Sequence, residues 1–130
     1  MTIKQNLWSK FSKAIRLQTA NHQGYVMCVS CEKIYPWQET DCGHFLENTE
    51  RSKTFGGNKL WFHPLNFGAQ CTKCNRFNAA SAKQLWTEKF IKMYGIEKIE
   101  EMRKMRDTPY KWTREEIEEK INSYEKSPQG

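Results

Sequence analysis

Two Cys-x-x-Cys pairs constrain the fold of this chain more than any other feature. Cys28 and Cys31 form the first pair, and Cys71 and Cys74 form the second. Zinc favours thiolate ligands, and two intervening residues let both sulfur atoms of a pair reach one ion from a tight turn. The spacing therefore predicts one tetrahedral structural zinc site that clamps the segment between the pairs.

The composition indicates that a structural metal would contribute much of the stability of the fold. Only 38% of the 130 residues are hydrophobic, and the mean hydropathy is −0.87, so the core is small and zinc would supply much of the stability. The first residues lack the apolar run of a signal peptide, and no stretch is apolar over the length of a transmembrane helix. We therefore expect zinc thiolates in the reducing cytoplasm, with no membrane partner, rather than disulfide bonds. Cys42, the fifth cysteine, is expected to be a small buried residue beside the site.

Hydrophobic periodicity predicts a single α+β domain over residues 1–130, built around the clamp. Its parts are an N-terminal helix within 1–20, a zinc-clamped core over 25–95 and a helical C-terminal extension over 96–130. The elements expected within these parts are a helix over 6–18, short strands at 25–27 and 40–46, and helices over 79–94, 96–106 and from Thr113 onward. Thr113 and Glu116 have the spacing of a capping box. In the helix after residue 79, the apolar stripe that includes Leu85 and Met93 is expected to lie in the core.

The charge indicates a polyanionic partner. The formal net charge is +6, which suits DNA or RNA. The cations that could position DNA through its phosphates lie on the first helix, in the loop after residue 47 and beside the second cysteine pair: Lys10, Lys13, Arg16, Arg51, Lys53, Lys73 and Arg76. The alternative is that these side chains only form solvated surfaces.

Three polar residues of the clamped region could hydrolyse a phosphodiester. The reaction needs a base for the attacking water, a cation for the developing charge and a fixed in-line geometry. His44 is the candidate base, and the side-chain carbonyl of Asn66 could accept its N–H and so fix the ring. Asn75, directly after Cys74, could offer an oxygen to Mg²⁺ or Mn²⁺. The structural alternative is a hydrogen-bonded histidine with turn or cap asparagines.

These residues, in this order and joined to the cysteine pairs, resemble the HNH group of His-Me finger nucleases. More closely, the chain resembles the phage NinG (Rap) recombination endonuclease family over residues 6–105. The stretches that carry the resemblance are Phe11 to Leu17, Cys28 to Cys31, Trp37 to Phe45, Asn66 to Asn75, and the helix that ends at Gly95.

The resemblance implies a ββα-metal core and a structure-selective DNA endonuclease acting on branched recombination intermediates such as Holliday junctions or D-loops. It matches His44 to the general base, Asn66 to the middle motif position, Asn75 to the last, metal-binding position, and the paired cysteines to the zinc ligands. Many HNH sites carry an aspartate directly before the base, where this chain has Gly43. Asp41 is a candidate substitute as a second ligand of the catalytic metal.

Three kinds of function therefore remain open. The leading hypothesis is a zinc-stabilised, Mg²⁺- or Mn²⁺-dependent DNA endonuclease in the bacterial cytoplasm, from a phage or prophage. A homodimer would suit an enzyme that cuts both strands of a symmetric junction. The alternatives are a non-catalytic zinc-finger protein that binds nucleic acid and an adaptor that works through the charged C-terminal helices. Metal-dependent cleavage would separate the first hypothesis from the other two.

Overall fold

The computed structural model of the chain describes residues 2–47 and 55–125. The predicted α+β class is confirmed: helices surround two small antiparallel sheets of two strands each. The helices are α1 (Ile3–Gln18), α2 (Ala79–Tyr94), α3 (Ile96–Arg106) and α4 (Arg114–Glu125). The strands are β1 (Tyr25–Met27), β2 (Ile34–Pro36), β3 (Thr40–His44) and β4 (Phe67–Cys71). Short helical turns complete the chain at η1 (Trp37–Glu39), η2 (Pro64–Asn66) and η3 (Lys73–Phe77).

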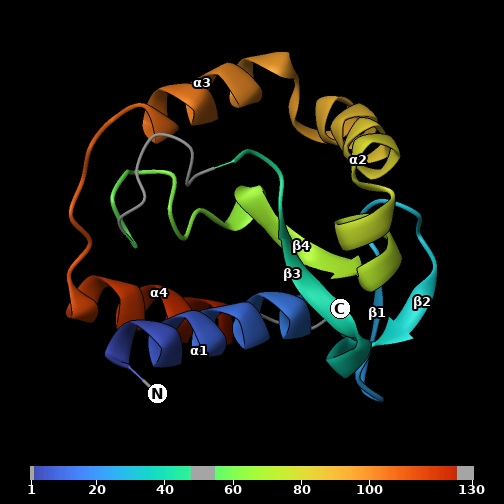
Figure 1. Ribbon diagram of the computed structural model, residues 1–130, viewed down its shortest axis with the longest axis horizontal. Helices are drawn as coiled ribbons and strands as arrows, with labels where there is room; N and C mark the ends of the chain where they lie inside the picture. The colour runs from blue at the N-terminus through green and yellow to red at the C-terminus, as the bar shows by residue number, and fades with distance from the viewer. Residues whose placement is uncertain (1, 48–54, 126–130) are drawn as a thin grey trace.

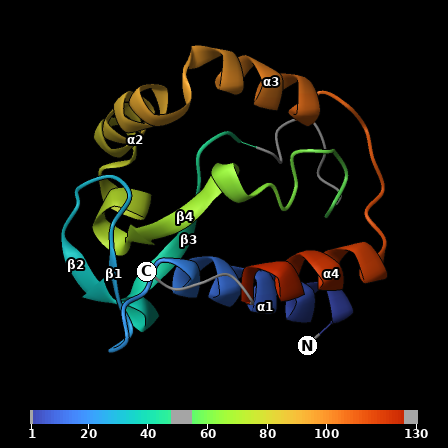
Figure 2. The same ribbon diagram turned by 180° about the vertical axis from the view of Figure 1, so that it is seen from behind.

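The β3–β4 hairpin lies at the centre of the molecule (Figure 1). The helices α1 and α4 run along one side of it, and α2 and α3 form an arch on the other, as the view from behind also shows (Figure 2). The register pairs Thr40 with Cys71 and His44 with Phe67. The hairpin therefore joins the strand that carries His44 directly to the second cysteine pair.

The helix α1 begins three residues earlier than the hydrophobic pattern predicts. Thr2 and Gln5 form a capping box, in which the Gln5 N–H donates to the Thr2 hydroxyl (3.1 Å) and the Thr2 N–H donates to the Gln5 side chain (2.9 Å). These bonds satisfy two backbone donors that have no partner inside a helix. The predicted capping box of α4 is confirmed, since the Thr113 N–H donates to Glu116 (2.9 Å) and the Glu116 N–H donates to Thr113 (3.2 Å).

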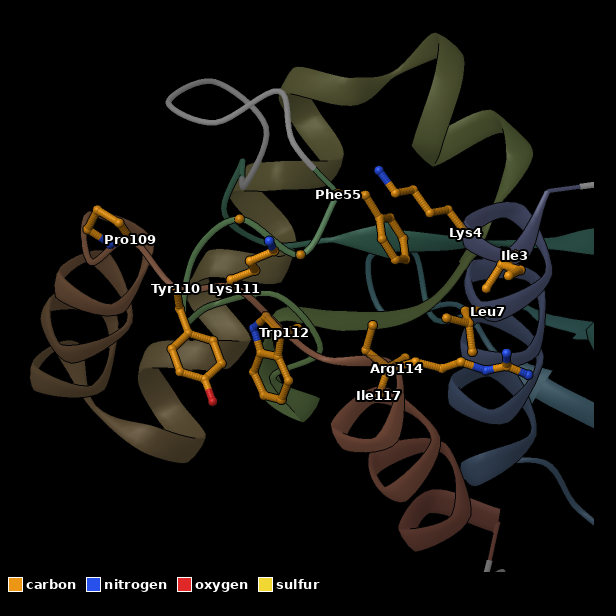
Figure 3. A pocket seen from close by; sticks show the side chains of 12 residues that line it. Ile3, Lys4, Leu7, Phe55, Pro109, Tyr110, Lys111, Trp112, Arg114 and Ile117 are labelled. Carbon is orange, nitrogen blue, oxygen red and sulfur yellow. The ribbon is translucent and has the colours of Figure 1, made fainter.

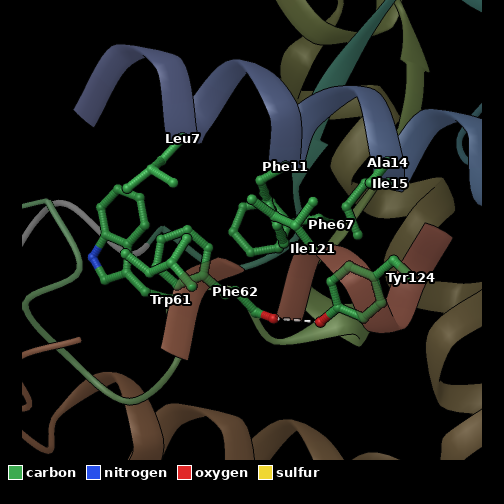
Figure 4. Packing of buried hydrophobic residues seen from close by; sticks show 10 residues of the cluster. Leu7, Phe11, Ala14, Ile15, Trp61, Phe62, Phe67, Ile121 and Tyr124 are labelled. Atoms are coloured by element: carbon green, nitrogen blue, oxygen red, sulfur yellow. Dashed lines mark hydrogen bonds between the residues drawn. The ribbon is translucent and has the colours of Figure 1, made fainter. Parts of the chain in front are cut away.

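An aromatic core joins α1 to α4 and to the chain before β4 (Figure 4). Phe11 is fully buried, and its ring centroid lies 5.0 Å from those of Phe62 and Phe67 and 5.8 Å from that of Tyr124. The Tyr124 hydroxyl donates to the Phe62 carbonyl oxygen at 2.6 Å. Edge-to-face contacts of this kind add to the stabilisation from apolar burial. The last helix is thus part of the main core.

A second core joins the end of β3 to α2 and α3. Its centre is Phe45, which stacks on Phe90 with a centroid distance of 4.5 Å and contacts Trp86. The expectation for two residues of α2 is wrong, because Leu85 is 43% exposed and Met93 is 70% exposed. The buried stripe of α2 follows a spacing of four residues from Ala82 through Trp86 to Phe90, and Leu85 and Met93 lie outside it.

Within the described residues, no helix combines the length and apolar character that crossing a membrane would require.

Candidate functional site

The structure brings the four paired cysteines into one cluster. Cys28 and Cys31 lie in the turn after β1, Cys71 ends β4, and Cys74 lies in η3. Their sulfur atoms all lie within 4.8 Å of one another, and the Cys31 and Cys71 sulfurs are 3.9 Å apart. Zinc–sulfur bonds of about 2.3 Å in a tetrahedron place the sulfurs roughly 3.8 Å apart, so the cluster fits a zinc ion. The clamp predicted from the spacing is confirmed as a site that could hold zinc.

The surroundings of the cluster favour a thiolate at Cys71. Burial raises the pKa of Cys71, but hydrogen bonds from Cys74 and from the Tyr35 and Cys28 side chains outweigh it and lower the pKa to about 7. The same bond to Cys71 is the main reason that the pKa of Tyr35 is raised to about 12. Burial raises the pKa of Cys74. Zinc would displace that thiol proton, so the affinity of the cluster for zinc falls in acid.

A second polar cluster lies where β3 meets η3. The Asn75 Nδ2 donates to the Asp41 Oδ2 at 3.0 Å. Arg76 holds the same carboxylate with two bonds, from Nε to Oδ2 and from Nη2 to Oδ1, each 3.2 Å long. This cluster borders a shallow cavity of about 300 Å³ that Trp8 and Arg16 of α1 also line. The two residues expected to bind a catalytic metal, Asp41 and Asn75, therefore do lie side by side.

A π-helical turn creates this meeting. η3 spans Lys73–Phe77 and includes Cys74, Asn75 and Arg76. Such wide turns are rare and occur often at functional sites. The sequence predicts only that a helix follows the cysteine pair, since no local signal marks the wider winding.

His44 lies away from this cluster. It is the last residue of β3, its side chain is 37% exposed, and its Nε2 is 3.0 Å from a carboxylate oxygen of Glu47. Side chains alternate between the two faces of a strand, so His44 and Asp41, three positions apart, project to opposite faces of the hairpin. The structure thus brings Asp41 and Asn75 together and places His44 elsewhere on the same strand.

The predicted bond between Asn66 and the His44 ring is wrong. Asn66 is fully buried, and its side-chain oxygen accepts from the Leu46 N–H at 2.7 Å, while its Nδ2 donates to the Leu46 carbonyl at 3.1 Å. Its own backbone carbonyl accepts from the Phe45 N–H at 2.7 Å. Asn66 therefore holds the chain just after His44 rather than the imidazole itself.

Two residues that the sequence pattern did not single out contact the end of β3. Glu47 is the carboxylate beside His44, and an acid three residues after a candidate base is the signal that could have found it. Lys83, from α2, donates to the backbone carbonyl oxygens of Phe45 and His44. Its approach depends on how α2 packs against the hairpin, which sequence spacing does not show.

The candidate phosphate-binding cations have different surroundings. Lys10, Lys13 and Lys73 are exposed, with the Lys13 ammonium 5.6 Å from the centroid of the Trp37 ring. Arg16 is instead engaged in the fold, since its guanidinium donates to the carbonyls of Ser12 (3.1 Å) and Thr40 (2.9 Å). Arg76 is held by Asp41 but keeps 62% of its side chain exposed. Arg51 and Lys53 lie outside the described residues.

Cys42 and His63 both have contacts that support the fold. Cys42 packs against the aromatic core, apart from the zinc cluster, and burial raises its pKa to about 12, so its thiol is inert at neutral pH. His63 caps η2, where its Nδ1 accepts from the Leu65 N–H at 3.1 Å.

Comparison with known proteins gives one match. A family model described as "Bacteriophage Lambda NinG protein" matches residues 3–129. Neither a curated protein nor a solved structure matches the chain. The matched range takes in both cysteine pairs, the hairpin and all of the helices described above.

Proposed function

Because this chain belongs to the NinG family, we propose that it serves phage recombination as a zinc-stabilised endonuclease that cuts branched DNA with a divalent metal. The order of its central elements supports this. A β-hairpin leads through the zinc clamp into a helix, which is the arrangement expected of a ββα-metal nuclease core. The clamp fixes the end of β4 and the start of η3, and so positions Asn75 of η3 against Asp41 of the neighbouring strand β3.

The observation that carries the proposal is the contact between Asp41 and Asn75. The Asn75 amide now turns its nitrogen to the Asp41 carboxylate, and a rotation of the amide would offer its oxygen instead. A carboxylate and a carboxamide oxygen are ligands that Mg²⁺ prefers, and Mg²⁺ commonly takes only one or two carboxylates and keeps several waters. A side chain at position 43 would displace Gln70, because a Cβ atom on Gly43 would lie 2.3 Å from the Gln70 side-chain oxygen. Asp41 is the carboxylate on the same face of the strand, and so it replaces a ligand at that position.

The bound metal would neutralise the charge that develops on the scissile phosphate. Arg76 then has a second role. Its guanidinium now holds the Asp41 carboxylate, and its exposed side chain can turn outward to a DNA phosphate when a cation takes its place.

His44 is the general base in this proposal, and Glu47 is its positioning residue. With its Nε2–H directed at the Glu47 carboxylate, the imidazole presents Nδ1 as the basic nitrogen. Because His44 and Asp41 project to opposite faces, cleavage requires the scissile phosphate to lie at the edge of β3, where a metal at Asp41 and a water activated by His44 could reach the same phosphorus atom. The exposed Lys10, Lys13 and Lys73 are the proposed contacts for other phosphates of the DNA.

The test compares a synthetic four-way junction with a linear duplex of matched sequence, using zinc-loaded protein with Mg²⁺ or without any added Mg²⁺ or Mn²⁺. We expect the protein to cut the junction only with Mg²⁺. His44→Ala should lower the rate by about 100-fold or more, the usual contribution of a general base, while zinc content and DNA binding stay unchanged. His22→Ala, which changes an exposed histidine outside the site, is the matched control and should cut normally.

A zinc-stabilised binding module is the second candidate function. The bidentate Arg76–Asp41 pair and the distance of His44 from that cluster along β3 favour it, because neither feature needs a catalytic metal. Tight junction binding without cleavage in Mg²⁺ or Mn²⁺, equal in the wild type and His44→Ala, would establish that function and refute the enzyme.

A further inference from the structure

An open groove lies between the first turns of α1 and the segment that leads into α4 (Figure 3). Its volume is about 660 Å³, within the range of roughly 300–1,000 Å³ typical of sites for small ligands. Leu7 and Ile117 form a buried floor. Three partly exposed aromatic side chains form the walls: Phe55, Tyr110 and Trp112. We call this feature the aromatic groove.

The aromatic wall is held rigidly by the fold. The Trp112 indole N–H donates to the Asn58 carbonyl oxygen at 2.9 Å, and its ring meets Phe62 edge-on at 5.4 Å. Gly56, with φ of +69°, brings the backbone beside the indole, where a Cβ atom would lie 3.3 Å from the Trp112 Cβ. A fixed aromatic surface loses little conformational entropy when a flat ligand stacks on it.

The rim of the groove is positively charged. Lys4, Lys111 and Arg114 line it, and among the described residues no acidic side chain lines the groove. Lys4 and Lys111 are exposed and form no ion pair with any other described residue, whereas the Arg114 Nε is 2.7 Å from Glu118. The groove thus combines apolar walls with cations at its edge.

We propose that the aromatic groove binds an unpaired nucleotide of branched DNA. Proteins that hold single strands combine aromatic surfaces for the bases with cations for the backbone, and both are present here. A paired base keeps its faces stacked inside the duplex and cannot enter. The groove would therefore select DNA with unpaired bases at a branch point, an inference that rests on the proposed DNA substrate.

The test uses 2-aminopurine, a fluorescent base whose emission falls when it stacks. One duplex carries it as a single unpaired base, and a second carries it paired with thymine. Full-length, zinc-loaded protein is titrated in buffer without chelator and without added Mg²⁺ or Mn²⁺, so that cleavage plays no part. We expect tighter binding to the unpaired probe and quenching of that probe alone.

The variants separate charge from stacking. Lys4→Ala and Lys111→Ala should each weaken binding to the unpaired probe about fivefold at 0.1 M salt, from a slope of about 0.7 per phosphate contact on single strands. Binding to the paired probe should not change. Phe55→Leu should reduce the quenching, with the melting temperature measured beside it because Phe55 packs on Trp61 at 5.1 Å. Lys92→Ala, an exposed lysine on α2, is the matched control.

Each outcome identifies which proposal fails. The groove proposal is refuted if the two probes bind equally and show the same change in fluorescence on binding. It is also refuted if neither lysine variant changes the affinity, which is the result expected if the groove binds a protein partner. Junction cleavage without quenching would leave the enzyme standing and remove the groove. Quenching and selective binding without cleavage in Mg²⁺ would support the groove and refute the enzyme. Failure to bind any DNA would refute both.

Discussion

Replacing Asn66 with alanine tests whether this residue supports the fold or the imidazole of His44. The side chain is fully buried and makes two hydrogen bonds to the backbone of Leu46, one as acceptor (2.7 Å) and one as donor (3.1 Å). Alanine removes both partners at once. The N–H and carbonyl of Leu46 then lose their bonds next to the end of β3.

The expected cost follows from the burial of these groups. A hydrogen bond contributes about 0.5–1.5 kcal/mol net when water can replace it, and leaving a buried group without a partner costs about 1–3 kcal/mol. Leu46 is half-buried, so water reaches its backbone only in part. We therefore expect Asn66→Ala to lower the free energy of unfolding by about 2–4 kcal/mol, at about 1–2 kcal/mol for each bond. For a chain of this length that corresponds to a fall in melting temperature of roughly 10 °C.

Thermal unfolding followed by circular dichroism, with zinc in excess, measures this change. Asn78→Ala is the matched control, because Asn78 is exposed and its side chain makes no capping bond at the start of α2. The control should change stability by less than about 0.5 kcal/mol. Junction cleavage is measured on the same samples at a temperature where both variants are folded. Loss of cleavage in Asn66→Ala with an unchanged melting temperature would refute this reasoning and restore Asn66 as the residue that orients His44.

Two further predictions concern the metal and pH. Removing zinc with a chelator should abolish the cooperative unfolding transition and most of the helical circular dichroism, because binding at the four-cysteine cluster is coupled to folding; retention of both in a metal-free sample would contradict a structural role. Burial, with smaller contributions from Lys120 and Lys98, lowers the pKa of His63 below its ordinary value of 6.5. The folded state therefore disfavours the charged ring, so this contribution to stability is complete above pH 6.5 and is lost as pH falls below it towards the lower folded pKa. His63→Asn should flatten the dependence of melting temperature on pH between about 5 and 7, and an unchanged slope would show that His63 does not contribute.

The sequence predicts the structure well where a local pattern is compatible with only one arrangement of the chain. Two Cys-x-x-Cys pairs can share a zinc ion only if the chain between them folds back, and Cys28 and Cys71 do meet. Thr113 and Glu116 predicted a helix start because the capping box is a local exchange of bonds. The apolar repeat predicts too late a start for α1, because the capping pair of Thr2 and Gln5 lies outside that repeat.

The candidate site was predicted less well, because its geometry depends on strand faces and on packing. The strand over residues 40–46 was expected, and the alternation of its side chains already implies that Asp41 and His44 face opposite ways. The exchange of bonds between Asn66 and Leu46 could not be foreseen, since it requires the return of the chain from η2 to the end of β3. The approach of Lys83 likewise depends on the packing of α2 against the hairpin.

The hairpin register explains why the clamp and the proposed metal-binding pair form one unit. Cys71 ends β4 opposite Thr40, so the residue next to Asp41 on β3 is paired with a zinc ligand. Asn75 follows directly after Cys74, the last ligand of the cluster. The positions of Asp41 and Asn75 are therefore each fixed within one residue of the four-cysteine site. Loosening of the clamp would move Asp41 and Asn75 relative to each other even where α1 and α4 keep their packing. Zinc at the clamp would therefore be a condition for the proposed metal-binding geometry as well as for the fold.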